Sequence, residues 1–199
     1  MRLSKINNPK LVLASSSPYR RELLGRLQIP FEILAPKIDE TPLKDEPAPA
    51  LVERLSISKA KAAAEKFPKA LIIGSDQVAV HNGHIVGKPH THDNAVQQLR
   101  EASGTRITLY TGLVLLNAST GTVQSEIVPF HVVFRSLSEE QIENYLRKEK
   151  PYKCAGSVRS EGLGISLLER FEGDDPNTLI GLPLIRLVRM LEKEGVQVI

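Results

Sequence analysis

The sequence has no tryptophan, and only 5% of its 199 residues are aromatic. Leu, Ile, Val and Ala must therefore build most of its core. Apolar residues at 41% and charged residues at 25% are close to the averages of globular proteins, which excludes a chain that is disordered throughout. This length is enough for one well-packed domain, and we expect a single domain over residues 1–199.

Cysteine is also scarce. Cys154 is the only one, which excludes an internal disulfide and a metal cluster held by several thiolates. No apolar run reaches the ~20 residues that a membrane-spanning helix needs. The apolar stretch near the N-terminus is too short for a signal peptide. We therefore expect a cytoplasmic protein with no membrane partner.

Long runs of one charge are missing too. The net charge is +3 and the sequence pI is about 9.0, but the Lys and Arg residues are dispersed. Proteins that bind nucleic acid more often carry a block or stripe of basic residues, so we expect no nucleic-acid partner. Dispersed cations are compatible with a small anionic ligand and equally with ordinary surface charge.

Hydrophobic patterning predicts strands and helices that alternate in the first half of the chain, with strands clustered in the middle. Strands are expected at residues 10–14, 31–38, 70–74, 107–117 and 122–134. Helices are expected after Ser17, at 48–67, after Thr91, after Ser138 and from 183 to 195. This order favours a mixed α/β fold with a long twisted sheet flanked by helices.

The first unusual feature is the segment Ser17-Pro18-Tyr19-Arg20-Arg21. Serine followed by proline is typical of a helix start, where Asp or Glu normally follow because they complement the helix dipole. Two arginines follow here instead. A bound phosphate would explain them, since free backbone amides, hydroxyls and guanidinium groups would all face it. The alternative is that these arginines pair with surface carboxylates such as Glu22.

A second unusual feature lies in the predicted helix 48–67. Lys59 falls on its apolar stripe, four residues after Leu55. An inward-facing lysine needs an anionic partner or ligand, unless its stem alone is buried and its ammonium group reaches water.

Acidic side chains follow two predicted strands. Asp76 comes directly after strand 70–74, and ligands of open α/β sheets gather at the carboxyl ends of strands. Glu40 follows strand 31–38, and Lys88 precedes a helix start. Each of these residues is also typical of an ordinary turn or surface. Together they indicate phosphoryl chemistry with a divalent ion.

Six segments carry a resemblance to a known family: ASSSPYRRELL, DETP, GSDQV, GKP, GSVRSEGLGI and DPNTLIGLPL. In this order they resemble the Maf family of nucleotide pyrophosphatases over nearly the whole chain. The resemblance implies an elongated Maf/ITPase-like α/β fold with two lobes around a cleft, often as a homodimer. It also implies hydrolysis of a nucleoside triphosphate between the α- and β-phosphates, with Mg, Mn or Co as the divalent cation.

The resemblance also assigns site residues. The phosphate-binding residues would be Ser15, Ser17, Arg20, Lys59 and Lys88. Asp76 would be the proton acceptor and, with Glu40, a metal ligand.

Three further positions resemble those that separate substrate classes: Tyr19, Gln77 and Glu161. They look like the branch acting on 7-methyl-GTP rather than the branch acting on dTTP and UTP. N7-methylated guanine is positively charged, so it suits an aromatic face and a carboxylate such as Glu161. The alternatives are a dTTP/UTP pyrophosphatase and a non-enzymatic regulator of cell division that senses nucleotides.

Overall fold

The computed structural model describes residues 9–199. Residues 1–8 lie outside the described residues. They belong to the N-terminal segment for which we predicted no signal peptide. The described strands are β1 (Leu11–Ala14), β2 (Phe31–Ile33), β3 (Leu71–His81), β4 (His84–Val86), β5 (Arg106–Asn117), β6 (Thr122–Phe134) and β7 (Leu168–Glu172). The described helices are α1 (Pro18–Gly25), α2 (Ala48–Ala64), α3 (His92–Ala102), α4 (Glu139–Glu149), α5 (Asn177–Ile180) and α6 (Leu184–Lys193), with short 3-10 turns η1 (Ala155–Ser157) and η2 (Leu163–Leu167).

The strands form a mixed sheet in the order β2-β1-β3-β5-β6-β7, with β4 paired to β3. Strand β1 is parallel to both β2 and β3, whereas β3–β4 and β6–β7 are antiparallel. The prediction of a mixed α/β fold with helices flanking a sheet is therefore confirmed.

Two compact units make up the described chain. The first contains residues 9–76, 111–128 and 177–199, and the second contains residues 77–110 and 129–176. Strands β3, β5 and β6 each contribute residues to both units. A single domain over residues 1–199 stays a prediction.

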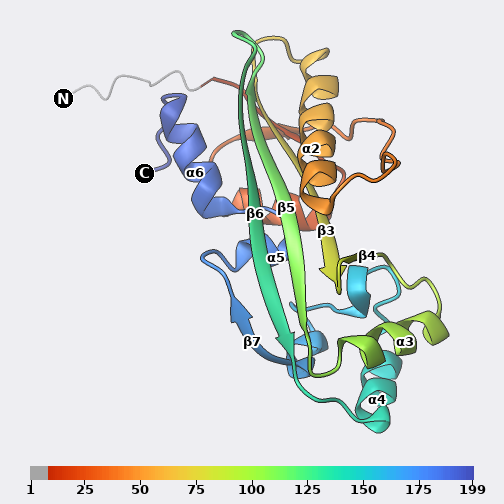
Figure 1. Cartoon of the computed structure of the whole chain (residues 1–199). Helices are drawn as coiled ribbons and strands as arrows, with labels where there is room; N and C mark the ends of the chain where they lie inside the picture. The colour runs from red at the N-terminus through yellow and green to blue at the C-terminus, as the bar shows by residue number, and fades with distance from the viewer. Residues whose placement is uncertain (1–8) are drawn as a thin grey trace. The chain divides into compact units, whose positions relative to one another are not determined.

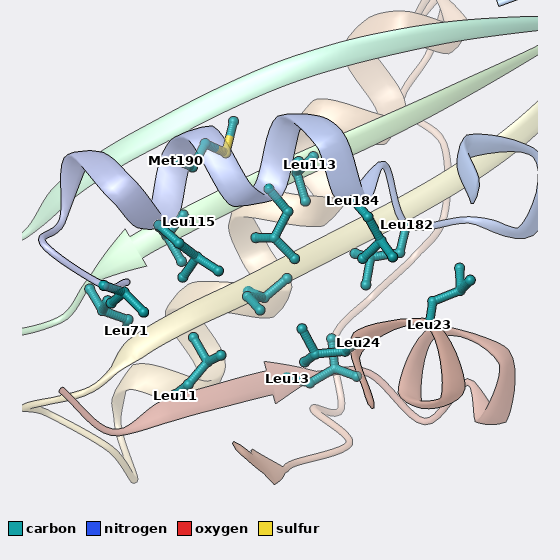
Figure 2. Close-up of a cluster of buried hydrophobic side chains, with 14 residues drawn as sticks. Leu11, Leu13, Leu23, Leu24, Leu71, Leu113, Leu115, Leu182, Leu184 and Met190 are labelled. Carbon is teal, nitrogen blue, oxygen red and sulfur yellow. The ribbon is translucent and has the colours of Figure 1, made fainter. Parts of the chain in front are cut away.

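The first unit has a hydrophobic cluster on each face of its strands. One face packs against α1 and α6 through the leucine-rich cluster drawn in Figure 2, which includes Leu11, Leu13, Leu23, Leu24, Leu71, Leu113, Leu115, Leu182, Leu184 and Met190. Alternate strand residues, including Val12 and Ile72, pack against Ala60 and Ala63 of α2 on the other face. Because side chains alternate along a strand, both faces of these strands are apolar, and α2 and α6 cover opposite faces (Figure 1).

Local capping signals place the helix starts as predicted. Ser17 caps α1 and Thr91 caps α3, each by accepting a hydrogen bond from a backbone amide three residues on. Ser138 and Gln141 form the expected capping box at the start of α4.

Two predicted strand boundaries were wrong. Strand β2 ends at Ile33 rather than at residue 38, and Pro36 in the following segment has no amide hydrogen with which to continue a ladder. Strand β3 continues past Gly74 to His81, so Asp76 lies inside the strand and not after its end. Among residues 9–199, no helix has both the length and the apolar character required to cross a membrane.

Candidate active site

The turn between β1 and α1 is built from serine hydroxyls and backbone amides. The Oγ of Ser15 accepts a hydrogen bond from the amide of Ser17 at 3.1 Å. The Oγ of Ser17 accepts one from the amide of Arg20 at 3.3 Å. Pro18 occupies the first helical position, where the missing amide hydrogen costs nothing. The turn therefore directs a helix N-terminus and two serines to one place, which suits an anion.

Arg20 is fixed by the backbone rather than by a neighbouring carboxylate. Its Nε donates to the carbonyl of Gly181 at 2.8 Å, and its Nη1 lies 3.5 Å from Ser15 Oγ. Glu22 instead lies 3.7 Å from Arg26, so the alternative of an Arg20–Glu22 pair was wrong. Among the described residues, nothing accepts a hydrogen bond from Nη2 of Arg20, which leaves part of the guanidinium available to a ligand.

Lys59 is buried and lies between two carboxylates. Only 7% of the residue is exposed, and its Nζ lies 2.6 Å from Asp76 Oδ1 and 2.9 Å from Glu40 Oε1. The alternative in which its ammonium group extends into water was therefore wrong. Asp76 itself is 9% exposed, so the Lys59–Asp76 contact is a buried ion pair.

Two glycines allow α2 to come close enough to the sheet for this contact. A Cβ at Gly74 would collide with the carbonyl oxygen of Ser56, and a Cβ at Gly112 would collide with that of Val52. Both carbonyls belong to the face of α2 that also carries Lys59, and larger residues at the two glycine positions would push the helix away.

The four charged groups of this site influence one another. Burial lowers the pKa of Arg20, while the negative charges of Asp76 and Glu40 act in the opposite direction. An arginine remains protonated at neutral pH despite such a shift. Arg20 and Lys59 therefore offset the charges of the two carboxylates, and the formal charge of the group is zero.

Sequence reasoning missed the role of Gly181, which accepts two hydrogen bonds at the site. Its carbonyl accepts from Arg20 Nε and also from Ser75 Oγ at 3.0 Å. Ser75 is fully buried and directly precedes Asp76. The φ of Gly181 is +113°, a conformation that favours glycine. The glycine just before the predicted last helix was the available signal, but nothing in the sequence linked it to Arg20.

Glu40 lies in a loop whose shape is set by polar contacts. The amide of Thr41 donates to Asp39 Oδ1 at 2.9 Å, which forms a local turn. Arg54 of α2 binds both carboxylate oxygens of Glu46 at 2.6 and 2.7 Å and the carbonyl of Thr41 at 3.1 Å. These contacts hold Thr41, the residue that follows Glu40. The side chain of Glu40 itself is 59% exposed.

Two of the predicted specificity residues are sequence neighbours of charged site residues: Tyr19 precedes Arg20, and Gln77 follows Asp76. Tyr19 is 41% exposed, and among residues 9–199 it has no hydrogen bond or ring contact. Gln77 follows Asp76 on β3 and is half-buried. Because neighbouring side chains of a strand point to opposite faces, Gln77 points away from the face that carries Asp76.

Lys88 and Glu161 belong to the second unit. Lys88 is exposed between β4 and α3. Glu161 is exposed, and its carboxylate lies 3.6 Å from Arg159 Nε and 3.3 Å from Ser160 Oγ. The structure thus brings together the six other predicted phosphate and metal residues in the first unit: Ser15, Ser17, Arg20, Glu40, Lys59 and Asp76.

The donor set suits a divalent ion only in part. Within the described residues, no three or more His, Cys, Asp or Glu side chains are grouped so as to hold a metal ion. Glu40 and Asp76 nevertheless approach one cationic atom, Lys59 Nζ. Two carboxylates fit an ion of the Mg²⁺ type, which takes one or two protein carboxylates and completes its shell with water and phosphate oxygens.

Comparison with known proteins identifies a family and a similar relative. The family model described as Maf-like protein matches residues 10–194. A protein from Nitrosococcus oceani named 7-methyl-GTP pyrophosphatase is 59% identical over 191 residues, which is 96% of this chain and 96% of that protein.

Proposed function

This chain belongs to the Maf-like protein family, and from that premise we propose that it hydrolyses 7-methyl-GTP to 7-methyl-GMP and diphosphate. The observation that carries the proposal is the buried Lys59–Asp76 pair, next to an arginine held at a helix N-terminus. The name of the 59% identical relative supports both the reaction and the substrate.

Phosphate binding is assigned to the β1–α1 turn and to the lysines. The hydroxyls of Ser15 and Ser17 and the free edge of Arg20 would bind phosphate oxygens, because all three lie at the N-terminus of α1. Lys59 would exchange part of its contact with Asp76 for a phosphate oxygen. Lys88 is the remaining cation that we assign to the triphosphate.

Asp76 is the proposed general base. Its carboxylate is buried beside Lys59. When a phosphate oxygen binds the ammonium group of Lys59, the carboxylate of Asp76 becomes available to accept a proton in a position with little solvent. Asp76 would take the proton of the attacking water as the water oxygen bonds to phosphorus. The anhydride bond between the α- and β-phosphates breaks, and diphosphate leaves with its negative charge facing Arg20 and Lys59.

A divalent cation, Mg, Mn or Co, is proposed at Glu40 and Asp76. Held there with the triphosphate, it would neutralise charge on the phosphate oxygens. The two carboxylates would keep their convergent arrangement, because Arg54 holds the loop that carries Glu40 and β3 holds Asp76.

Tyr19, Gln77 and Glu161 are the proposed specificity residues. Tyr19 offers an exposed aromatic face without competing contacts in the described part of the chain, and such a face attracts a cationic base by about 0.5–2 kcal/mol. Glu161 offers carboxylate oxygens for the donor edge of guanine.

The experiment measures diphosphate release from 7-methyl-GTP, GTP, dTTP and UTP, each with Mg²⁺, Mn²⁺ or Co²⁺. We expect 7-methyl-GTP to give the highest kcat/KM. Asp76→Asn should fold and bind nucleotide but lose turnover by at least about 100-fold, whereas Asp93→Asn, an exposed matched change on α3, should behave as the parent. Higher kcat/KM for dTTP or UTP would refute the substrate assignment, and full turnover by Asp76→Asn would refute the base.

Three further statements stay predictions. The cytoplasmic location and the absence of nucleic-acid and membrane partners come from the sequence, and the homodimer comes from the family resemblance. Sedimentation of the purified protein tests the oligomeric state directly.

A further inference from the structure

The segment 157–164, which carries Glu161, begins with a residue held in an unusual conformation. Ser157 has a φ of +60° and is fully buried, although it is not glycine. The hydroxyl of Tyr145 donates to the carbonyl of Ser157 at 3.1 Å and accepts from the amide of Arg159 at 3.1 Å. One buried hydroxyl of α4 thus fixes the backbone on both sides of Val158.

A second side chain of α4 holds the far end of the segment. Glu149 Oε2 accepts from the amide of Leu163 at 2.7 Å, and Glu149 Oε1 accepts from Arg159 Nη1 at 3.1 Å. A Cβ at Gly162 would lie only 2.8 Å from Glu149 Oε1, so the backbone rests directly on the carboxylate. Tyr145 and Glu149 are four residues apart and share one face of the helix.

A third contact joins the start of the segment to the segment before α3. Gln98 Oε1 accepts from Ser157 Oγ at 2.5 Å, and Gln98 Nε2 donates to the carbonyl of Gly87 at 3.1 Å. The carbonyl of Gly87 also accepts from the amide of Gly156 at 3.2 Å. The residue before Lys88 and the start of segment 157–164 are therefore held to each other.

Glu161 lies between these anchors and is oriented through one of them. Its carboxylate lies 3.6 Å from Arg159 Nε, and Arg159 is bound by Tyr145 through its amide and by Glu149 through its guanidinium. The contacts thus run from α4 through Arg159 to Glu161. Burial also raises the pKa of Tyr145 well above its ordinary value, so its hydroxyl stays protonated and able to donate.

We propose that Tyr145 and Glu149 are positioning residues for base recognition, holding segment 157–164 so that Glu161 meets the guanine edge without reordering. This inference rests on the proposed function, because it takes Glu161 as a base contact. A preordered loop binds more tightly than one that must be ordered by the ligand. Loss of either anchor should therefore weaken substrate binding and selectivity more than it slows the chemical step.

The test uses Tyr145→Phe in the full-length enzyme, because the change removes both hydrogen bonds and keeps the ring. We expect KM for 7-methyl-GTP to rise about tenfold and its preference over GTP to fall by a similar factor, with kcat changed less than about twofold. Tyr110→Phe is the matched control, since Tyr110 is half-buried on β5 and its hydroxyl has no hydrogen bond within residues 9–199. Glu149→Gln keeps an acceptor for Leu163 and should be milder than Glu149→Ala.

The outcomes separate this inference from the proposed function. Glu161→Gln is measured alongside. If Glu161→Gln lowers the preference but Tyr145→Phe and Glu149→Ala change only the melting temperature, the positioning role is wrong and the role of Glu161 stands. If Glu161→Gln leaves the preference unchanged, Glu161 is not a base contact and the inference falls with it. If Tyr145→Phe is too unstable to assay, Glu149→Gln and Glu149→Ala decide whether the anchors act on substrate preference or only on stability.

Discussion

Replacing Lys59 with methionine removes the ammonium group that Asp76 and Glu40 share, while keeping a straight side chain of similar length. The two carboxylates should respond differently. Glu40, with 59% of its side chain exposed, regains water, whereas Asp76 is left buried without its partner at 2.6 Å. Removing one partner of a buried pair costs about 3–5 kcal/mol. Because the Asp76 side chain keeps some exposure and Arg20 still attracts it, we expect a loss of about 3 kcal/mol, at the lower end of that range.

The assay is urea unfolding at neutral pH, in which the loss appears as a lower midpoint at unchanged slope. Lys61→Met is the matched control, because Lys61 lies on the same helix, is exposed and forms no ion pair within residues 9–199. Its effect should stay within about 0.5 kcal/mol. The double variant Lys59→Met with Asp76→Asn removes the uncompensated charge and should recover most of the stability.

Equal urea midpoints for Lys59→Met and Lys61→Met would refute this expectation, since a buried carboxylate cannot lose the cation that lies 2.6 Å from it at no cost. A double variant no more stable than Lys59→Met would place the loss in packing rather than in charge.

Two more predictions concern the neighbouring contacts. Arg20→Lys keeps the charge but loses the planar group that binds the carbonyl of Gly181, so kcat/KM should fall about tenfold. Arg21→Lys, at an exposed position, should have little effect. Equal losses in the two variants would contradict the assignment of Arg20 to phosphate binding. Hydrogen bonds from Arg54 lower the pKa of Glu46 from 4.5 to about 2, so this pair stabilises the fold fully above pH 4.5 and progressively less as the pH falls toward 2. Urea midpoints measured from pH 7 to pH 2.5 should fall more steeply for the parent than for Glu46→Gln, and identical profiles would show that the pair does not form in solution.

Features that depend on a few consecutive residues could be predicted from the sequence. The helix starts at Ser17 and Ser138 follow from hydroxyls that bind amides three residues away. The inward position of Lys59 follows from the spacing of a helix. The alternation of strands and helices predicted the fold class, because hydrophobic patterning is also a local property of the sequence.

Features that depend on distant partners could not be predicted in this way. The sequence placed Asp76 after the strand, because a carboxylate inside a buried strand is costly. Lys59, a cation on another element, offsets that cost. The bond from Arg20 to Gly181 spans 161 residues and ends on a backbone carbonyl, which carries no residue-specific signal. The resemblance supplied the roles of the site residues, and these roles stay predictions until the variants are measured.

The Gly181 carbonyl also bears on the order in which the protein can become active during synthesis. Ribosomes deliver the N-terminal part of a chain first, and the β1–α1 turn, Lys59 and Asp76 are all made well before residue 181. Arg20 and Ser75 find their common acceptor only when the segment between α5 and α6 has been made. A nascent chain that ends before this glycine would therefore carry the charged residues of the site without the contact that orients Arg20, and we expect catalytic competence to arise only after residue 181 has been made.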